Sequence, residues 1–95
     1  MNKNDYLFKV CLDVWSKSNQ EDMVIEEMSE LTKAILKQRR KPSIENNNKI
    51  LEEIADVDLM IDQMKYIYRR YKPEIYKIKQ KKIDRLKGII NLYCQ

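Results

Sequence analysis

A scarcity of helix-breaking residues is the feature that most constrains this chain. One glycine and two prolines occur in 95 residues, and the prolines, Pro42 and Pro73, lie at junctions between periodic apolar segments. Hydrophobic residues make up 43% of the chain and charged residues 36%, which suits helices with one apolar and one solvated face. We therefore expect a single all-α domain over residues 1–95, built from long amphipathic helices.

Apolar periodicity predicts four helices that form a bundle. They are expected over residues 5–17, 19–38, 44–70 and 73–93. Ser18, with Glu21 three residues later, is typical of a capping box that starts the second helix. Ser43 is expected to cap the third helix, although a run of asparagines could delay its start to Lys49, and Pro73 suits the first turn of the fourth. A bundle this small leaves apolar side chains uncovered, so we expect a homo-oligomer with a dimer as its minimal unit.

Charge is segregated along the chain. Residues 1–64 carry 9 basic and 13 acidic side chains, a net charge of −4, whereas residues 65–95 carry 10 basic and 2 acidic side chains, a net charge of +8. The basic end is either an ordinary solvated helix or a contact for a polyanion such as nucleic acid or a phosphate tail.

Other absences narrow the chemistry and the location. The chain has no histidine, which removes the commonest zinc ligand and the commonest general base. No apolar run is long enough to span a membrane, and the first residues lack the apolar core of a signal peptide. We expect a cytoplasmic protein with no membrane partner, in which Cys11 and Cys94 are free thiols.

Two segments of the chain repeat one pattern of acids and apolar residues. Residues 24–35 read VIEEMSELTKAI and residues 50–61 read ILEEIADVDLMI. The matching apolar stripes are Val24, Met28, Leu31 and Ile35 in the first segment, and Ile50, Ile54, Val57 and Ile61 in the second. The acids that sit three residues apart beside these stripes are Glu27 and Glu30, then Glu53 and Asp56. If the stripes pack together, the four carboxylates converge at the edge of one core, whereas Glu26 and Glu52 face water.

Converging carboxylates require a positive charge between them. At about 5 Å and an effective dielectric near 20, each pair repels by roughly 3 kcal/mol. Hard oxygen ligands without histidine or cysteine indicate Mg²⁺, with Mn²⁺ as the alternative. One such acid pair is common on a solvated helix, but two pairs in the same phase against matching stripes favour a metal site.

The acid pattern also resembles that of a known family. Glu27-x-x-Glu30, 22 intervening residues and Glu53-x-x-Asp56 resemble the E-x-x-E … E-x-x-D signature of the MazG-like and dimeric-dUTPase-like all-α pyrophosphohydrolases. Residues 15–20 are similar to the family's W-G-x-x-x-Q segment, with Ser16 in place of the glycine. Residues 82–86 are similar to its K-x-x-R-L segment, and the resemblance covers roughly residues 10–90.

The resemblance implies a metal-dependent enzyme that hydrolyses a nucleoside triphosphate to a monophosphate and pyrophosphate, in nucleotide-pool house-cleaning. The implied Mg²⁺ ligands are Glu27, Glu30, Glu53 and Asp56. Such ions neutralise the triphosphate and lower the pKa of a water molecule, whose proton one carboxylate accepts. Glu30 and Asp56 are the expected catalytic pair because they lie nearer the rim of the site than their partners.

Further residues are candidates for contacting the substrate. Lys82 falls near the centre of the fourth helix's apolar stripe, with Lys79 and Arg85 beside it, so these cations either extend past the stripe to water or hold the departing pyrophosphate. Gln20 lies on the same side of its helix as Glu27 and could bond a base edge. Trp15 could stack on that base, although a lone tryptophan on an apolar face more often belongs to the core.

Two other classes of function remain open from the sequence. One is a non-catalytic helical module that binds nucleic acid through residues 65–95, which is less favoured because such a module has no use for four converging carboxylates. The other is a structural helical oligomer that has lost the family's activity. The sequence does not indicate which base or sugar the substrate carries.

Overall fold

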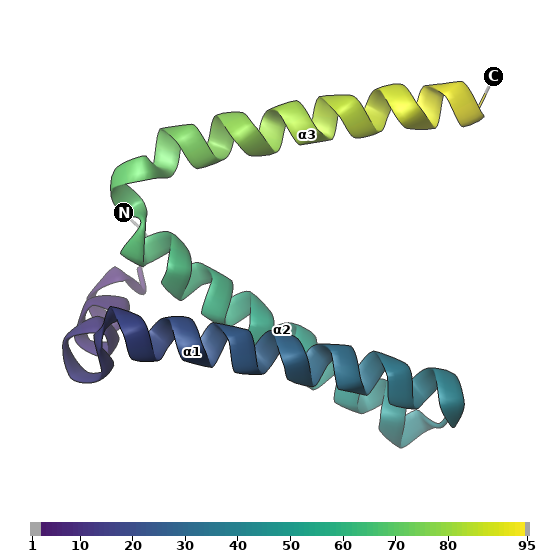
Figure 1. Cartoon of the computed structure of the whole chain (residues 1–95), viewed down its shortest axis with the longest axis horizontal. Coiled ribbons are helices and arrows are strands. Elements are labelled where there is room, and N and C mark those ends of the chain that lie inside the picture. The colour runs from purple at the N-terminus through teal and green to yellow at the C-terminus, as the bar shows by residue number, and fades with distance from the viewer. Residues whose placement is uncertain (1–2, 95) are drawn as a thin grey trace.

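The computed structural model describes residues 3–94 as an arrangement of helices (Figure 1). The helices are α1 (Asp5–Arg40), α2 (Ile44–Ile67), a short 3-10 turn η1 (Arg69–Tyr71) and α3 (Lys72–Tyr93). No strand occurs within the described part of the chain, so the predicted all-α class is confirmed. None of the helices described is long and apolar enough to cross a membrane.

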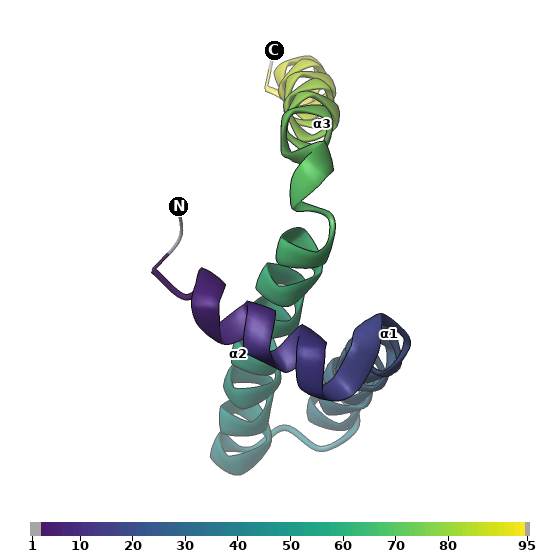
Figure 2. The same cartoon turned by 90° about the vertical axis from the view of Figure 1, so that its left-hand side faces the viewer.

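The two helices predicted over residues 5–17 and 19–38 are both present within α1, where a kink at Ser16 separates them. This residue has φ 69° and ψ 161°, and the segment before it runs in a different direction from the rest of α1 (Figure 2). The Ser16 hydroxyl accepts a hydrogen bond from the backbone N–H of Asn19 at 3.3 Å. The prediction that Ser18 caps the second helix was therefore wrong, because the change of direction comes two residues earlier and leaves Ser18 inside α1.

A compact turn joins α1 to α2. Ser43 is the N-cap of α2, as predicted, and its hydroxyl accepts the Asn46 backbone N–H at 3.0 Å. The Ser43 backbone N–H donates to Gln38 Oε1 at 3.1 Å, and Asn46 Nδ2 donates to the Lys41 carbonyl at 2.7 Å. These bonds satisfy groups at both helix ends, so α2 begins at Ile44 and the asparagines do not delay it.

Helices α1 and α2 pack as an antiparallel hairpin along a narrow seam. Its buried residues are Gln20, Val24 and Ala34 from α1, and Glu53, Met60 and Gln63 from α2. The predicted apolar stripe lies only partly in this seam, since Met28 is 51% exposed and Ile54 is 50% exposed. The predicted face of each helix was therefore wrong: the side of each helix that packs in the seam is turned from the apolar stripe toward the acids. Consequently a second apolar face of the hairpin stays uncovered.

Aromatic contacts hold the N-terminal segment of α1 against the end of α2. Phe8 is 2% exposed, and its ring centroid lies 6.3 Å from that of Tyr66. The Arg69 guanidinium lies over the Tyr66 ring, 4.3 Å from its centroid, and the Lys17 ammonium lies 5.0 Å from the Tyr68 centroid. Such contacts fix the bent segment across the hairpin's end.

Helix α3 projects away from the hairpin (Figures 1 and 2). Pro73 lies in its first turn, as predicted, and the helix joins the rest of the chain mainly through η1. None of its described residues is buried. A four-helix bundle is therefore not closed within one chain.

Candidate metal centre

Three carboxylates from the two arms of the hairpin meet at one point. Glu27 of α1 and Glu53 and Asp56 of α2 each offer an oxygen atom, and these oxygens lie within 4.8 Å of one another. The antiparallel pairing of α1 and α2 places Glu27 opposite the turn of α2 that carries the other two acids. The predicted convergence of the acid pairs is thus present for three of the four residues.

Glu53 is the buried member of this acid cluster. It is 4% exposed, and its Oε1 lies 3.0 Å from the ammonium of Lys49 one turn earlier. Its second oxygen, Oε2, is buried without a hydrogen-bond partner. A buried carboxylate oxygen without a donor is costly, so this atom is free to accept a donor or a cation that enters the seam.

The pKa values of Glu27 and Lys49 are both raised by the surroundings of these two side chains. The pKa of Glu27 is raised above its usual 4.5, first because burial disfavours the charged carboxylate and then because Asp56 and Glu53 repel it. The pKa of Lys49 is raised above its usual 10.5, first by its hydrogen bond to Glu53. The site therefore holds excess negative charge that a single lysine at its edge offsets only in part.

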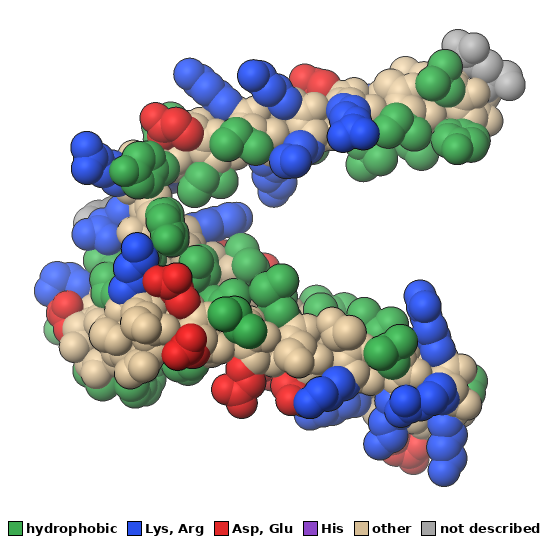
Figure 3. Space-filling view, viewed as in Figure 1, with side chains coloured by type: hydrophobic (Ala, Val, Ile, Leu, Met, Phe, Trp, Pro, Cys, Tyr) green, Lys and Arg blue, Asp and Glu red, His purple; other side chains and the backbone are tan. Residues whose placement is uncertain are grey.

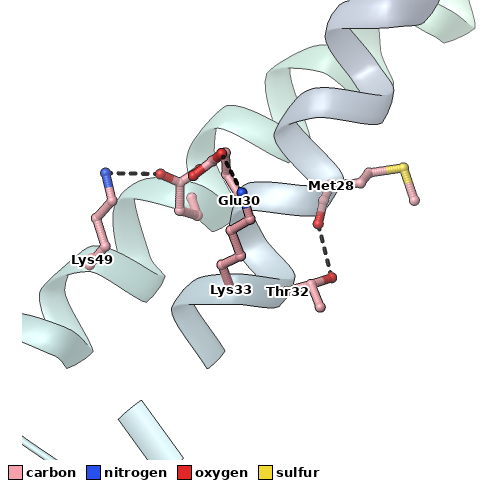
Figure 4. A network of polar contacts seen from close by, with 6 residues as sticks. Met28, Glu30, Thr32, Lys33 and Lys49 are labelled. Carbon is pink, nitrogen blue, oxygen red and sulfur yellow. Dashed lines mark hydrogen bonds and ion pairs between the residues drawn. The ribbon is translucent and has the colours of Figure 1, made fainter. Parts of the chain in front are cut away.

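Glu30, the fourth predicted ligand, lies outside this group of oxygens. Its carboxylate pairs with Lys33 on the same helix at 3.6 Å (Figure 4), and the side chains of Lys33 and Glu30 are 71% and 43% exposed. Glu30 is still close enough to add to the raised pKa of Glu27. Its role as a ligand or as the catalytic base stays a prediction, whereas Asp56 lies in the cluster and is exposed at its rim.

The structure places the two residues predicted to contact the base in different settings. Gln20 is 1% exposed in the seam, and its Nε2 has no hydrogen-bond partner. Trp15 is 46% exposed and lies on the other side of the bend at Ser16. Gln20 therefore has an unused donor on the face that carries the acids, but a base edge reaches it only if the seam opens.

The three predicted phosphate-binding cations lie on α3. Lys79 lines a pocket of about 310 Å³ between the N-terminal segment, the end of α2 and the start of α3. Lys82 and Arg85 border a shallow hollow on α3 together with Leu86 and Ile89. Within one chain, no ion pair among residues 3–94 joins any of these cations to the acid cluster.

The sequence prediction assigned no role at the site to Lys49, at the edge of the acid cluster, or to Gln63, in the seam. Lys49 lies four residues before Glu53, a spacing that puts both on one helix face and could have indicated the ion pair. Gln63 is 8% exposed and its Oε1 has no hydrogen-bond partner. Gln63 follows Met60 by three residues and Asp56 by seven, a helical spacing that places all three on one face of α2 and could have indicated its position in the seam.

The donor set suits a hard divalent cation. Carboxylate oxygens from two rigid helices, with no nitrogen or sulfur donor in the cluster, are the ligands that Mg²⁺ and Mn²⁺ prefer. Comparison with known proteins adds no identity: no family model matches the chain, and no curated protein or solved structure matches it significantly.

Proposed function

We propose that the chain is a metal-dependent nucleoside triphosphate pyrophosphohydrolase, which releases pyrophosphate and a nucleoside monophosphate. The observation that carries this proposal is the buried, unpartnered Oε2 of Glu53 beside Glu27 and Asp56. Together with the sequence resemblance, it favours a site built to bind Mg²⁺ or Mn²⁺ with a triphosphate. A structural module would gain nothing from burying an acid in this way.

The residues present fit such a cation. Glu53 supplies a preformed buried ligand, since α2 holds its side chain in the seam, and Glu27 and Asp56 supply ligands from the two sides of the seam. When bound, the ion neutralises phosphate charge and lowers the pKa of a water molecule. The proton acceptors in this proposal are the predicted Asp56, which is exposed at the rim of the cluster, and Glu30.

The active species in this proposal is a homo-oligomer. The predicted phosphate-binding residues Lys82 and Arg85 do not reach the acid cluster of their own chain. The projecting α3 exposes apolar side chains along its whole length. Both observations support association with a further copy, with a dimer as the minimal unit.

A product screen tests the proposed reaction. The purified chain is incubated with canonical and modified nucleoside triphosphates and Mg²⁺, and orthophosphate is measured with and without an added inorganic pyrophosphatase. We expect orthophosphate only when the pyrophosphatase is present, and none in EDTA. Orthophosphate that does not require the added enzyme would show cleavage at the γ-phosphate and would reject the proposal, as would inactivity over the whole panel.

A further inference from the structure

A pocket lies where three parts of the chain meet, away from the acid cluster. The N-terminal segment of α1, the end of α2 and the start of α3 bound a volume of about 310 Å³. None of Glu27, Glu53 and Asp56 is among the residues that line it. Ligand pockets in proteins range from about 300 to 1,000 Å³, so this one suits a single small molecule.

Positive charge dominates the lining of this pocket. Four cationic side chains contribute to it, from α2, η1 and α3: Lys65, Arg69, Lys72 and Lys79. Within residues 3–94, no ion pair joins any of them to a carboxylate, and Figure 3 shows Lys and Arg side chains around the corner where α3 leaves the hairpin. Asp5 and Asp62 also line the pocket, which leaves an excess of two positive charges. An anion is therefore attracted to it.

One aromatic ring at the pocket is free for stacking. The ring of Tyr66 is already in contact with Phe8 and with the Arg69 guanidinium. Tyr76 of α3 also lines the pocket and is 67% exposed, and among residues 3–94 its ring pairs with no other ring or cation. The faces of nucleic acid bases stack on such rings. The pocket therefore offers an aromatic surface beside its cations.

The polar groups of the pocket match a phosphate and a sugar. Arg69 Nη1 donates to the Tyr66 carbonyl at 3.0 Å, which holds the guanidinium at the pocket while its other N–H groups remain for a ligand. A guanidinium fork suits phosphate oxygens. Lys72 is the first residue of α3, so the positive end of the helix dipole lies there as well. Asp5 and Asp62 only accept hydrogen bonds when ionised, which suits the hydroxyls of a sugar.

We infer that this pocket binds a nucleoside 5′-monophosphate without a metal ion. The phosphate lies against Arg69 and the lysines of the pocket, and the base stacks on Tyr76. The sugar hydroxyls donate to Asp5 or Asp62. A phosphate monoester carries a charge of about −1.5 to −2 at neutral pH, which the excess of two positive charges balances, whereas a triphosphate keeps uncompensated charge unless a metal ion accompanies it. This site does not rest on the proposed hydrolysis, which is assigned to the acid cluster.

Calorimetric titration in EDTA tests the inference, because no divalent cation then occupies the acid cluster. Uridine and adenosine 5′-monophosphates should each bind saturably, with one nucleotide per chain and an affinity that falls as salt is added. Ribose 5-phosphate, which lacks the base, and the free nucleosides, which lack the phosphate, should bind at least about tenfold more weakly. No binding, binding that requires Mg²⁺, or ribose 5-phosphate that binds as tightly as the nucleotides would each overturn the inference. Monophosphates are not substrates of the proposed reaction, so a failure here leaves the product screen unaffected.

Two matched pairs of variants test the named contacts. Lys72→Ala removes a charge at the pocket, and Lys77→Ala removes one from α3 outside its lining. Tyr76→Ala removes the free ring, and Tyr93→Ala removes an 83% exposed ring at the end of the same helix. All four side chains are exposed, so helix content by circular dichroism should be unchanged. The pocket variants should raise the Kd by at least about fivefold, and the controls by less than about twofold. Equal losses within either pair would show attraction to a basic helix without a pocket and would reject the inference.

Amide shifts of the ¹⁵N-labelled chain locate the nucleotide directly. On titration with uridine 5′-monophosphate in EDTA, the largest changes should fall within residues 62–79, and largest changes around Glu27 and Glu53 would overturn the inference. A 5′-phosphorylated trinucleotide offers the same chemistry at the end of a nucleic acid strand. It should bind no more than about tenfold more tightly than the monophosphate, since the pocket holds one unit. Tighter binding would assign the pocket to strand ends and reject the free nucleotide.

Discussion

The ammonium of Lys49 lies 3.0 Å from Oε1 of Glu53, while Oε2 of the same carboxylate is buried without a partner. Lys49 thus offsets part of the charge of a buried acid from the edge of the cluster. The side chain of Lys49 is 55% exposed, so it can leave the site without disturbing the seam. This arrangement makes Lys49 a competitor for the ligand that a divalent cation would use.

Replacing Lys49 separates its stabilising ion pair with Glu53 from its competition with a divalent cation. Lys49→Ala leaves Glu53 without its ion pair, so the melting temperature in EDTA should fall by a few degrees. The upward shift on adding Mg²⁺ should become larger than in the wild type, because the cation no longer competes with an ammonium. Lys33→Ala, which removes the more exposed pair with Glu30, is the control and should change neither quantity. An Mg²⁺ shift in Lys49→Ala no larger than that of the wild type would show that Lys49 does not share the site.

The raised pKa of Glu27 predicts how stability depends on pH without metal. A carboxyl whose pKa is raised on folding contributes stability that is fully present below its unfolded value of 4.5 and is lost as the pH rises through the folded value. In EDTA, the wild type should therefore lose melting temperature relative to Glu27→Gln as the pH rises from about 4.5 toward neutrality. Asp22→Asn, which changes an exposed acid that is not among the groups raising the pKa of Glu27, should track the wild type. Parallel curves for wild type and Glu27→Gln would show that Glu27 is not crowded by the other acids.

The bend at Ser16 predicts a stabilising substitution. With φ 69° and ψ 161°, Ser16 adopts a conformation that is essentially restricted to glycine and costs other residues about 1–3 kcal/mol. Ser16→Gly should therefore raise the unfolding free energy by about 1 kcal/mol, since losing the hydroxyl cap to glycine costs only a few tenths. Ser16→Ala keeps the strain and loses the bond to Asn19, so it should lower stability by about 1 kcal/mol. Urea unfolding of the three proteins measures these free energies. A Ser16→Ala protein more stable than Ser16→Gly would contradict the strained backbone at Ser16.

The sequence predicted the features of this fold that depend on local chemistry. Ser43 could be predicted as a cap because its side chain accepts a hydrogen bond from a backbone N–H at the start of α2. Pro73 could be predicted in a first turn because proline lacks the backbone N–H that a helix leaves unpaired there. The phase of the α1–α2 seam could not be predicted in this way, because Met28 and Ile54 are as apolar as residues that are buried. Which apolar face a helix buries against its own chain depends on the other helices available, and α3 does not cover either face.

The candidate site was predictable to the same extent. The doubled acid pattern indicated that the two helices bring carboxylates together, and Glu27, Glu53 and Asp56 do meet. The burial of Glu53 was not predictable, since it follows from the rotation of the seam toward the acids. Lys82 and Arg85 border a hollow on the projecting α3, and periodicity along one helix does not encode where that helix lies relative to the acids.

The central claim is that the acid cluster is a cation site rather than a charged surface, and it rests most heavily on Glu53. Glu53→Gln keeps the size of a buried side chain but removes a negative charge from the cluster. In EDTA the variant should be more stable than the wild type by about 1 kcal/mol, which corresponds to a melting temperature several degrees higher. Under assay conditions with Mg²⁺, turnover should fall by about a hundredfold.

The most direct test is a set of melting curves for wild type, Glu53→Gln and Glu52→Gln, each with EDTA and with millimolar Mg²⁺. Glu52 is the adjacent control: its side chain is 70% exposed and pairs loosely with Lys49 at 3.6 Å. Glu53→Gln should melt above the wild type in EDTA and below it in Mg²⁺, because ion binding to the folded state stabilises only proteins that keep the site. Glu52→Gln should follow the wild type in both conditions. If Glu52→Gln and Glu53→Gln respond alike to Mg²⁺, the carboxylates of the seam do not form a metal site.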